Sequence, residues 1–303
     1  MGLFKKVPGW KVLTDGQLKK LKENLVEIAS DFADCCDRNG INYMMGAGTA
    51  LGAIRHKGFI PWDDDMDFHM PRKDYNKFLD VAVQELGDKY IFKSNAKGDK
   101  VPYPSIHMIR RNTRYVNYAD LLAMSDVPLE EQGIYIDIIP YDNASSIKAF
   151  RYFKESVGLG LYFIASCVDL NNTIRYFNKM KFEMEKQDYD AIKLKMMIGK
   201  LFSFWPEWKW MTIIDKFATS NKNDDSKWVT CYVGKKIDKY THLRADLWGD
   251  NRAEFEGHMW KIANNPTKYL TKEYSVDYMT PPPENKRKVH PIFELQFSDG
   301  TKL

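Results

Sequence analysis

The chain opens with a hydrophobic pattern typical of an amphipathic helix. Thr14 and Gln17 form a capping box, in which each side chain can bond the backbone N–H of the other residue. Apolar residues then recur at helical spacing over residues 18–36, and Gly40 ends the pattern. The sequence therefore predicts one long helix at the start of the domain.

The next hundred residues contain short apolar runs that are typical of strands, separated by turn signals. A glycine turn after the first run leads into a short helix, and Pro71 ends the second run before an amphipathic helix over residues 72–86. Residues 90–114 are predicted to hold two strands. The clearest runs are residues 41–45, 63–70, 106–109 and 133–140.

The second half has a different character. Residues 146–217 are aromatic, basic and helical in pattern, and the segment from residue 228 is rich in loop signals. This predicts an α/β (α+β) fold whose mixed sheet core, residues 1–145, is flanked by helices. Residues 146–303 are predicted to form a mainly helical, loop-rich extension that packs on the core and completes the substrate site.

Composition narrows the protein class. Of the 303 residues, 44% are hydrophobic and 28% charged, a balance typical of soluble globular proteins. The net charge of +4 allows an anionic ligand or membrane surface without demanding either, and we expect no nucleic-acid partner. Residues 1–6 lack the apolar stretch typical of a signal peptide, so we expect none, and residues 157–168 are too short an apolar run to span a bilayer. We expect a cytoplasmic location, with peripheral contact at the inner face of the membrane as an open alternative.

The strongest chemical signal is a run of four aspartates within residues 63–67. In a strand, Asp63, Asp65 and Asp67 would share one face, with neighbouring side chains about 7 Å apart. That spacing suits a pair of divalent ions about 3.5–4 Å apart. The hard oxygen ligands favour Mg²⁺ or Mn²⁺. The alternative is a solvated acidic turn, which explains Asp63 and Asp64 but not Asp67, whose neighbours are apolar.

A further carboxylate, Asp137, lies inside the apolar run of residues 134–140. An unpaired carboxylate there would be costly to bury, and a metal ion or cationic partner would remove the cost. Asp137 is therefore a candidate metal ligand or general base. A purely structural aspartate remains an alternative, and Asp142 is interpreted as an ordinary loop residue.

The turn at residues 46–52 holds three glycines and Thr49 between a strand and a helix. Gly48 lets the backbone approach a ligand closely, and the helix start and Thr49 could bond a phosphate. Such a turn is structural as often as functional, so its weight comes from its place before the aspartates. Nearby cations and an aromatic side chain suit a bound diphosphate, with plain surface charge as the alternative: Arg55, His56, Lys57 and Trp62.

Residues 48–67 as a block resemble the LicD family, which includes the fukutin-type proteins. The likeness continues through residues 70–75, and residues 135–142 resemble the family's second acidic strand. Residues 282–290 look like its closing motif, together with shorter matches at residues 255–257, 269–270 and 278–279. One departure is the stretch 274–279, which lacks the glycine usual in the family and carries an extra residue.

The resemblance implies a nucleotidyltransferase fold with Asp65 and Asp67 as the metal-binding pair and Asp137 as the third carboxylate. It also implies transfer of phosphocholine from CDP-choline to a cell-surface glycan, such as teichoic acid or lipopolysaccharide, or to a lipid-linked precursor. Some relatives use other CDP-linked donors, such as CDP-ribitol.

Cations also gather near the end of the chain, where Lys286, Arg287, Lys288 and His290 follow three prolines. Arg287 and His290 are candidates for binding donor phosphate or an anionic acceptor, with a solvated basic tail as the alternative. The tryptophans in residues 205–210 fit a core, a sugar-stacking surface or, as a minority interpretation, a membrane contact.

Together these signals predict a metal-dependent transferase that moves a phosphoryl-linked group from a CDP-linked donor onto a sugar hydroxyl. Two alternatives remain open. The protein could transfer the nucleotide itself and release pyrophosphate, or it could be a non-catalytic glycan-binding protein of the same fold.

Overall fold

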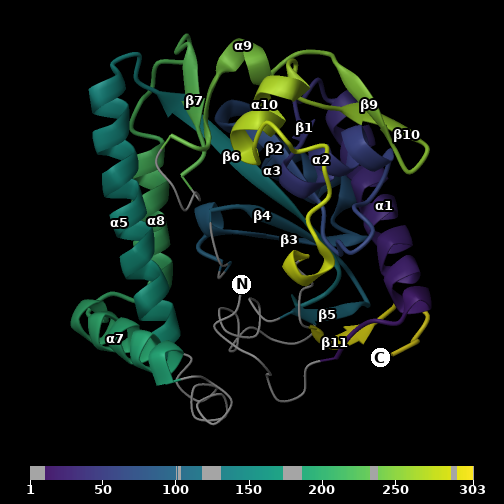
Figure 1. Ribbon diagram of the computed structural model, residues 1–303, viewed down its shortest axis with the longest axis horizontal. Helices are drawn as coiled ribbons and strands as arrows, with labels where there is room; N and C mark the ends of the chain where they lie inside the picture. Colours follow the sequence, from purple (N-terminus) through teal and green to yellow (C-terminus); the bar gives the residue numbers. More distant parts are fainter. Residues whose placement is uncertain are drawn as a thin grey trace.

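A seven-stranded mixed sheet organises the fold in the computed structural model of the protein (Figure 1). The structure describes residues 11–99, 101, 104–117, 131–172, 186–232, 238–287 and 292–302. The central strands, β2 and β6, run parallel, and the other strand pairs in these ranges are antiparallel. The main path is β1 (Met44–Met45), β2 (Asp67–Pro71), β6 (Tyr135–Ala144), β4 (Ile106–Arg110) and β3 (Tyr90–Ser94), with β7 (Trp228–Thr230) on β6 and β8 (Thr241–Leu243) on β7. The mixed α/β class is confirmed.

Three helices of the first half form where the pattern predicts them: α1 (Asp15–Arg38), α2 (Ala47–His56) and α3 (Arg72–Leu86). The capping box at the start of α1 is present, with both Thr14 and Gln17 bonding the partner's backbone N–H. Gly40 follows α1 with φ of 59°, a left-handed conformation that glycine adopts without strain. Local sequence signals therefore set these boundaries.

The strand predicted over residues 63–70 is wrong in its first half, because β2 begins only at Asp67. A turn at residues 61–62 is followed by an irregular segment over residues 63–66. On one side of β2, the two-residue β1 pairs only with Phe68 and His69, so it offers residues 63–66 no ladder. The proposed shared strand face of Asp63, Asp65 and Asp67 therefore does not exist.

The strand predicted to end at Pro140 continues to Ala144. Pro140 has no N–H to donate. It lies between the stretches of β6 that pair with β4 and with β7, so no hydrogen bond to either strand is lost. β4 pairs with β6 only up to Ile138, and β7 pairs with it only from Asp142. Asp142 is consequently a buried strand residue and not the loop residue that we predicted.

Three helices form an arm on one side of the sheet, at the left of Figure 1. They are α5 (Lys148–Asn172), α7 (Lys186–Phe202) and α8 (Glu207–Ala218). Their buried side chains form a small separate cluster that includes Val168, Trp210 and Ile214. The helical character predicted for this stretch is confirmed.

The segment after residue 228 is more regular than its loop signals predict. Besides β7 and β8 it contributes a strand that pairs with β5 (Arg114–Asn117), a hairpin and two helices. The elements are α9 (Arg244–Leu247), β9 (Arg252–Phe255), β10 (His258–Lys261), α10 (Pro266–Glu273) and β11 (Ile292–Gln296), with a 3₁₀ turn at Glu284–Lys286. In the first half of the chain, another 3₁₀ turn, Asn95–Lys97, follows β3. The domain boundary after residue 145 stays a prediction.

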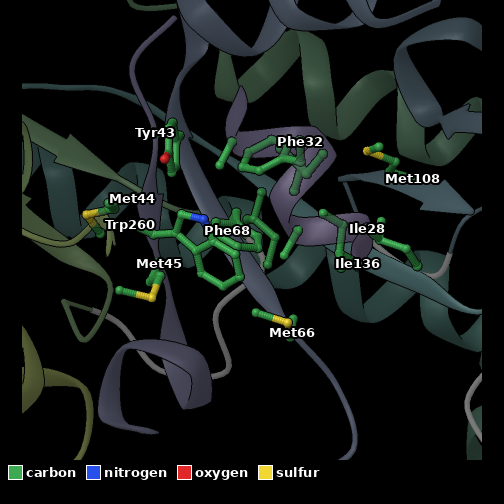
Figure 2. Close-up of a cluster of buried hydrophobic side chains, with 14 of the residues drawn as sticks. Ile28, Phe32, Tyr43, Met44, Met45, Met66, Phe68, Met108, Ile136 and Trp260 are labelled. Atoms are coloured by element: carbon green, nitrogen blue, oxygen red, sulfur yellow. The ribbon is translucent and has the colours of Figure 1, made fainter. Parts of the chain in front are cut away.

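The main core lies between the sheet and α1, and Figure 2 shows its centre. The Phe32 ring packs 4.6 Å from the Phe68 ring and 5.2 Å from the Tyr43 ring, measured between centroids. Trp260 of β10 reaches Phe68 at 6.1 Å. The late hairpin therefore completes a core that the first half of the chain begins.

Candidate functional site

The site is built across three neighbouring strands. Asp67 of β2 stands opposite Asp137 of β6 in the parallel register, and His107 of β4 stands opposite Asp137 on its other side. Side chains in register on adjacent strands point to the same face of the sheet. His107 Nε2 lies 2.9 Å from Asp137 Oδ1, and both side chains are buried. We call this line of Asp67, Asp137 and His107 the acidic row.

The irregular segment before β2 brings further carboxylates to the acidic row. The pKa of Asp65 is raised well above its usual range, chiefly because the side chain is buried. The negative charges of Asp63, Asp67, Asp64 and Asp137 raise it further, in that order. Five carboxylates therefore share one region, although only Asp67 and Asp137 reach it from strands.

The glycine turn positions this segment. Thr49 Oγ1 accepts a hydrogen bond of 2.9 Å from the Asp67 N–H, and the Gly46 N–H donates to the Asp67 carbonyl oxygen. At Gly48, a Cβ atom would lie 2.7 Å from Asp63 Oδ2, so a larger residue would require the Asp63 side chain to move away from α2. Thr49 is buried and holds the backbone of Asp67; its contact with a phosphate stays a prediction.

The start of α2 is itself held from the far end of the chain. Ala47 has φ of 37°, a left-handed conformation that is unfavourable for a residue with a Cβ. Its N–H donates to Tyr269 Oη at 2.8 Å, and Tyr269 is fully buried. The strained turn beside the acidic row therefore depends on α10.

Besides His107, two other side chains at the site were not predicted from the sequence. The Tyr115 hydroxyl of β5 donates to Asp64 Oδ2 at 3.1 Å. Lys22 of α1 donates to the Pro61 carbonyl oxygen at 3.0 Å. Burial lowers the pKa of Lys22, and the nearby acidic charges oppose that shift. His107 left a readable signal, a single histidine in an apolar strand, whereas Lys22 and Tyr115 left none.

The predicted phosphate-binding cations separate into two groups. Arg55 is brought to the site: burial lowers its pKa, while the charges of Tyr274 and Asp63 raise it. Its guanidinium donates to the Tyr278 carbonyl oxygen and to His56 Nε2, both at 2.9 Å. Burial and then the Arg55 charge lower the pKa of His56, so its neutral ring accepts this bond.

Lys57 faces elsewhere. It caps the end of α2 with φ of 56°, and its ammonium lies 3.3 Å from Glu254 of the β9–β10 hairpin. The structure therefore ties Lys57 to the hairpin, and a contact between Lys57 and substrate stays a prediction.

Trp62 and Arg287, predicted separately, are brought together. The Arg287 guanidinium carbon lies 4.4 Å from the centre of the Trp62 ring, a cation–π contact. His290 lies outside the described residues. Tyr274, on the same C-terminal segment, has a raised pKa because of burial first and the charges of Asp67 and Asp63 next. The C-terminal segment therefore forms one wall of the site.

The carboxylates suit a hard divalent cation in their chemistry. Oxygen ligands are those that Mg²⁺ and Mn²⁺ prefer, and the repulsion that raises the pKa of Asp65 is what such a cation would relieve. Among the residues that the structure describes, no three His, Cys, Asp or Glu side chains form a ready-made metal site. The donor set fits such an ion, and its final arrangement is not preformed.

The site is distinct from a hollow of about 1310 Å³ at the opposite end of β2 and β6. Arg72 and Asp142 on its wall are joined by two hydrogen bonds of 2.7 and 2.9 Å, and Asp215 of α8 lies 2.8 Å from Arg72. These charges satisfy one another and join the core to the arm.

Comparison with known proteins supports the family resemblance that the motifs indicate. The LicD/FKTN/FKRP nucleotidyltransferase domain matches residues 40–145, which include the glycine turn, the aspartates and the whole acidic row. Residues 40–145 are therefore similar to the nucleotidyltransferase domain of the LicD family. The recognition of the LicD family from its motifs is confirmed, and these matches support a phosphotransferase enzyme.

Similar proteins extend the match beyond that domain. The chain is 27% identical to the lipopolysaccharide cholinephosphotransferase LicD of Haemophilus influenzae, over 89% of this chain and 94% of that protein. It is 33% identical to an uncharacterized protein of Rickettsia typhi, over 27% of this chain and 29% of the relative. An uncharacterized protein of Rickettsia prowazekii is 37% identical over 20% of this chain and 26% of its own length. In the described ranges, every helix is too short or too polar to cross a bilayer.

Proposed function

We propose that this LicD-family protein transfers phosphocholine from CDP-choline onto a sugar hydroxyl of a cell-surface glycan, or of its lipid-linked precursor. Support comes from similarity along most of both chains to a lipopolysaccharide cholinephosphotransferase. The single observation that carries the proposal is the register of Asp67 with Asp137 on the two central parallel strands. This register directs two carboxylates from well-packed strands to the same face of the sheet.

The carboxylates of Asp63, Asp65, Asp67 and Asp137 are the proposed ligands of Mg²⁺ or Mn²⁺. When bound, such a cation offsets the negative charge of the donor diphosphate and of the departing CMP. Without it, five carboxylates in one region would repel an anionic donor. The fit rests on the oxygen donors and on the burial that raises the pKa of Asp65.

Side chains of the protein are the proposed groups for binding the donor phosphates and accepting the proton of the attacking hydroxyl. Arg55 and Arg287 are the proposed partners of donor phosphate oxygens, and Gly48 keeps the start of α2 open to close approach. Asp137 is the proposed acceptor of the proton of the attacking hydroxyl, with His107 holding the carboxylate by its contact at 2.9 Å. The sugar oxygen forms a bond to the choline-bearing phosphorus as the bond from that phosphorus to the CMP oxygen breaks.

A donor panel tests the reaction class. The purified protein is incubated with Mg²⁺, a glycan acceptor and, separately, CDP-choline, CDP-ribitol or CTP, and the products are identified by mass. The proposal expects CMP and a glycan heavier by one phosphocholine from CDP-choline alone. CMP release from CDP-ribitol instead would reassign the donor.

Two other outcomes contradict the proposal. Pyrophosphate release with CTP would mean nucleotidyl transfer. Glycan binding without turnover of any donor, with or without Mn²⁺, would mean a non-catalytic binding protein. A matched reaction with a chelator added separates metal dependence from the identity of the donor.

A further inference from the structure

The outer face of α7 carries an apolar stripe that is largely exposed. Leu194, Met197 and Leu201 recur at spacings of three and four residues, so they lie on one side of the helix. Their side chains are 58%, 61% and 71% exposed. Phe204, Trp205 and Trp208 extend the exposure through the turn into α8. We call these six residues the tip patch; Figure 1 places α7 at the end of the arm, away from the sheet.

The opposite side of α7 is already filled by the fold. Ile192 and Met196 are buried there, and α5 packs closely along the helix. At Gly199 a Cβ atom would lie only 2.1 Å from the Cys167 carbonyl oxygen of α5. The stripe therefore cannot be covered by a rotation of α7 within the arm. A helix that is apolar on both sides normally has a partner on each side.

The charges around the tip patch are mainly positive. Lys193 and Lys200 are exposed beside the stripe, and Lys209 lies 6.0 Å from the centre of the Trp208 ring. Asp190 is the exposed acid nearest the stripe on α7 within the described residues. Apolar and tryptophan side chains flanked by lysines are the combination that suits the interface of an anionic bilayer.

We propose that the tip patch docks the protein on a membrane surface that contains anionic phospholipid. The apolar side chains enter the boundary between headgroups and acyl chains, and the lysines lie at the level of the lipid phosphates. The binding itself depends on the arm alone. Its use, delivery of the acidic row to a lipid-linked acceptor, rests on the proposed function.

Vesicle sedimentation tests the docking directly and requires no activity. The full chain is spun with vesicles of phosphatidylcholine alone or of phosphatidylcholine with phosphatidylglycerol, and the bound fraction is measured. Binding is expected to the mixed vesicles only. Replacing Leu194, Met197 and Leu201 together by serine should abolish it, whereas the matched exposed substitutions Met259→Ser and Val83→Ser should leave it unchanged.

The lysines give a graded second readout. Lys193→Gln and Lys200→Gln should each weaken binding to the mixed vesicles about fivefold. Lys19→Gln and Lys97→Gln, exposed on other elements, should not weaken it. Circular dichroism spectra checked for every variant keep loss of fold apart from loss of binding.

Two results would overturn the docking proposal. One is wild-type protein that stays in the supernatant with both vesicle types. The other is a dimer in light scattering that the triple serine variant dissociates, since the tip patch would then bind a second copy. CMP release from soluble CDP-choline, measured on the same variants, reports on the proposed function separately.

Discussion

The sheet core and the arm differ in how completely their apolar side chains are buried. In α1, the apolar residues lie on one face of the helix. Leu25, Ile28 and Phe32 on this face are almost fully buried. In α7, apolar residues occupy an inner face packed on α5 and an outer face left exposed. The apolar face of α1 is therefore buried within the core, and this packed core can hold the acidic row rigidly. In the arm, the outer apolar face of α7 stays exposed and is available for contact with another molecule.

The sharpest test of the core half of this comparison is Asp67→Asn. It removes one charge of the acidic row while keeping the strand, so transfer activity should fall about a thousandfold. Thermal unfolding should show that stability is kept or raised, because a repelling charge is lost. Asp80→Asn, on the exposed side of α3, is the matched control and should retain activity. Full activity in Asp67→Asn would remove the acidic row from the mechanism.

The junction between the two regions is tested by Arg72→Met. Arg72 bridges the nearly buried Asp142 of β6 and Asp215 of α8, and its loss leaves both carboxylates unpaired. The free energy of unfolding should fall by about 3 kcal/mol. Arg38→Met breaks an exposed, solvent-screened pair with Glu85 and should lower the free energy of unfolding far less. Equal losses in urea denaturation would show that the junction is no stronger than a surface pair.

Packing inside the arm is probed by a pair of glycines. Gly199→Ala places a methyl group against the Cys167 carbonyl oxygen and should destabilise the protein by about 2 kcal/mol. Gly160→Ala in α5 meets nothing within 4 Å and should stabilise it by up to about 1 kcal/mol through helix propensity. Melting temperatures that shift in the same direction for both variants would contradict the close packing of α5 and α7.

A final test uses a pH dependence that arises in the core and needs no substitution to be seen. Burial, and then the charge of His242, lower the pKa of His69 from its ordinary 6.5 to about 3. Below pH 6.5 the unfolded chain therefore takes up a proton that the folded chain refuses. Stability is fully present above pH 6.5 and should fall by about 1.4 kcal/mol per pH unit as the pH drops toward 3. Urea titrations at pH 7, 6 and 5 should show a flatter dependence for His69→Leu; identical slopes would contradict it.

Local signals predicted much of the fold. The capping box at Thr14 and the apolar spacing of α3 gave correct helix positions, because capping bonds and amphipathic faces depend on neighbours in the chain. Strand ends were predicted less well. Residues 63–65 were wrongly predicted as part of a strand, and Asp142 was wrongly predicted as a loop residue. The length of a strand depends on its partner strands and not on the local sequence pattern.

The sequence by itself determined the helices of residues 15–86, the helical character of residues 146–217, the two acidic segments and the resemblance to the LicD family. Only the tertiary structure decided that Asp137 stands between Asp67 and His107, that Tyr269 holds the turn at Ala47, and that Trp62 meets Arg287. The reason is physical. Periodicity and capping act over a few residues, whereas strand register and side-chain contacts join residues far apart in the chain, and these exist only once the core has packed.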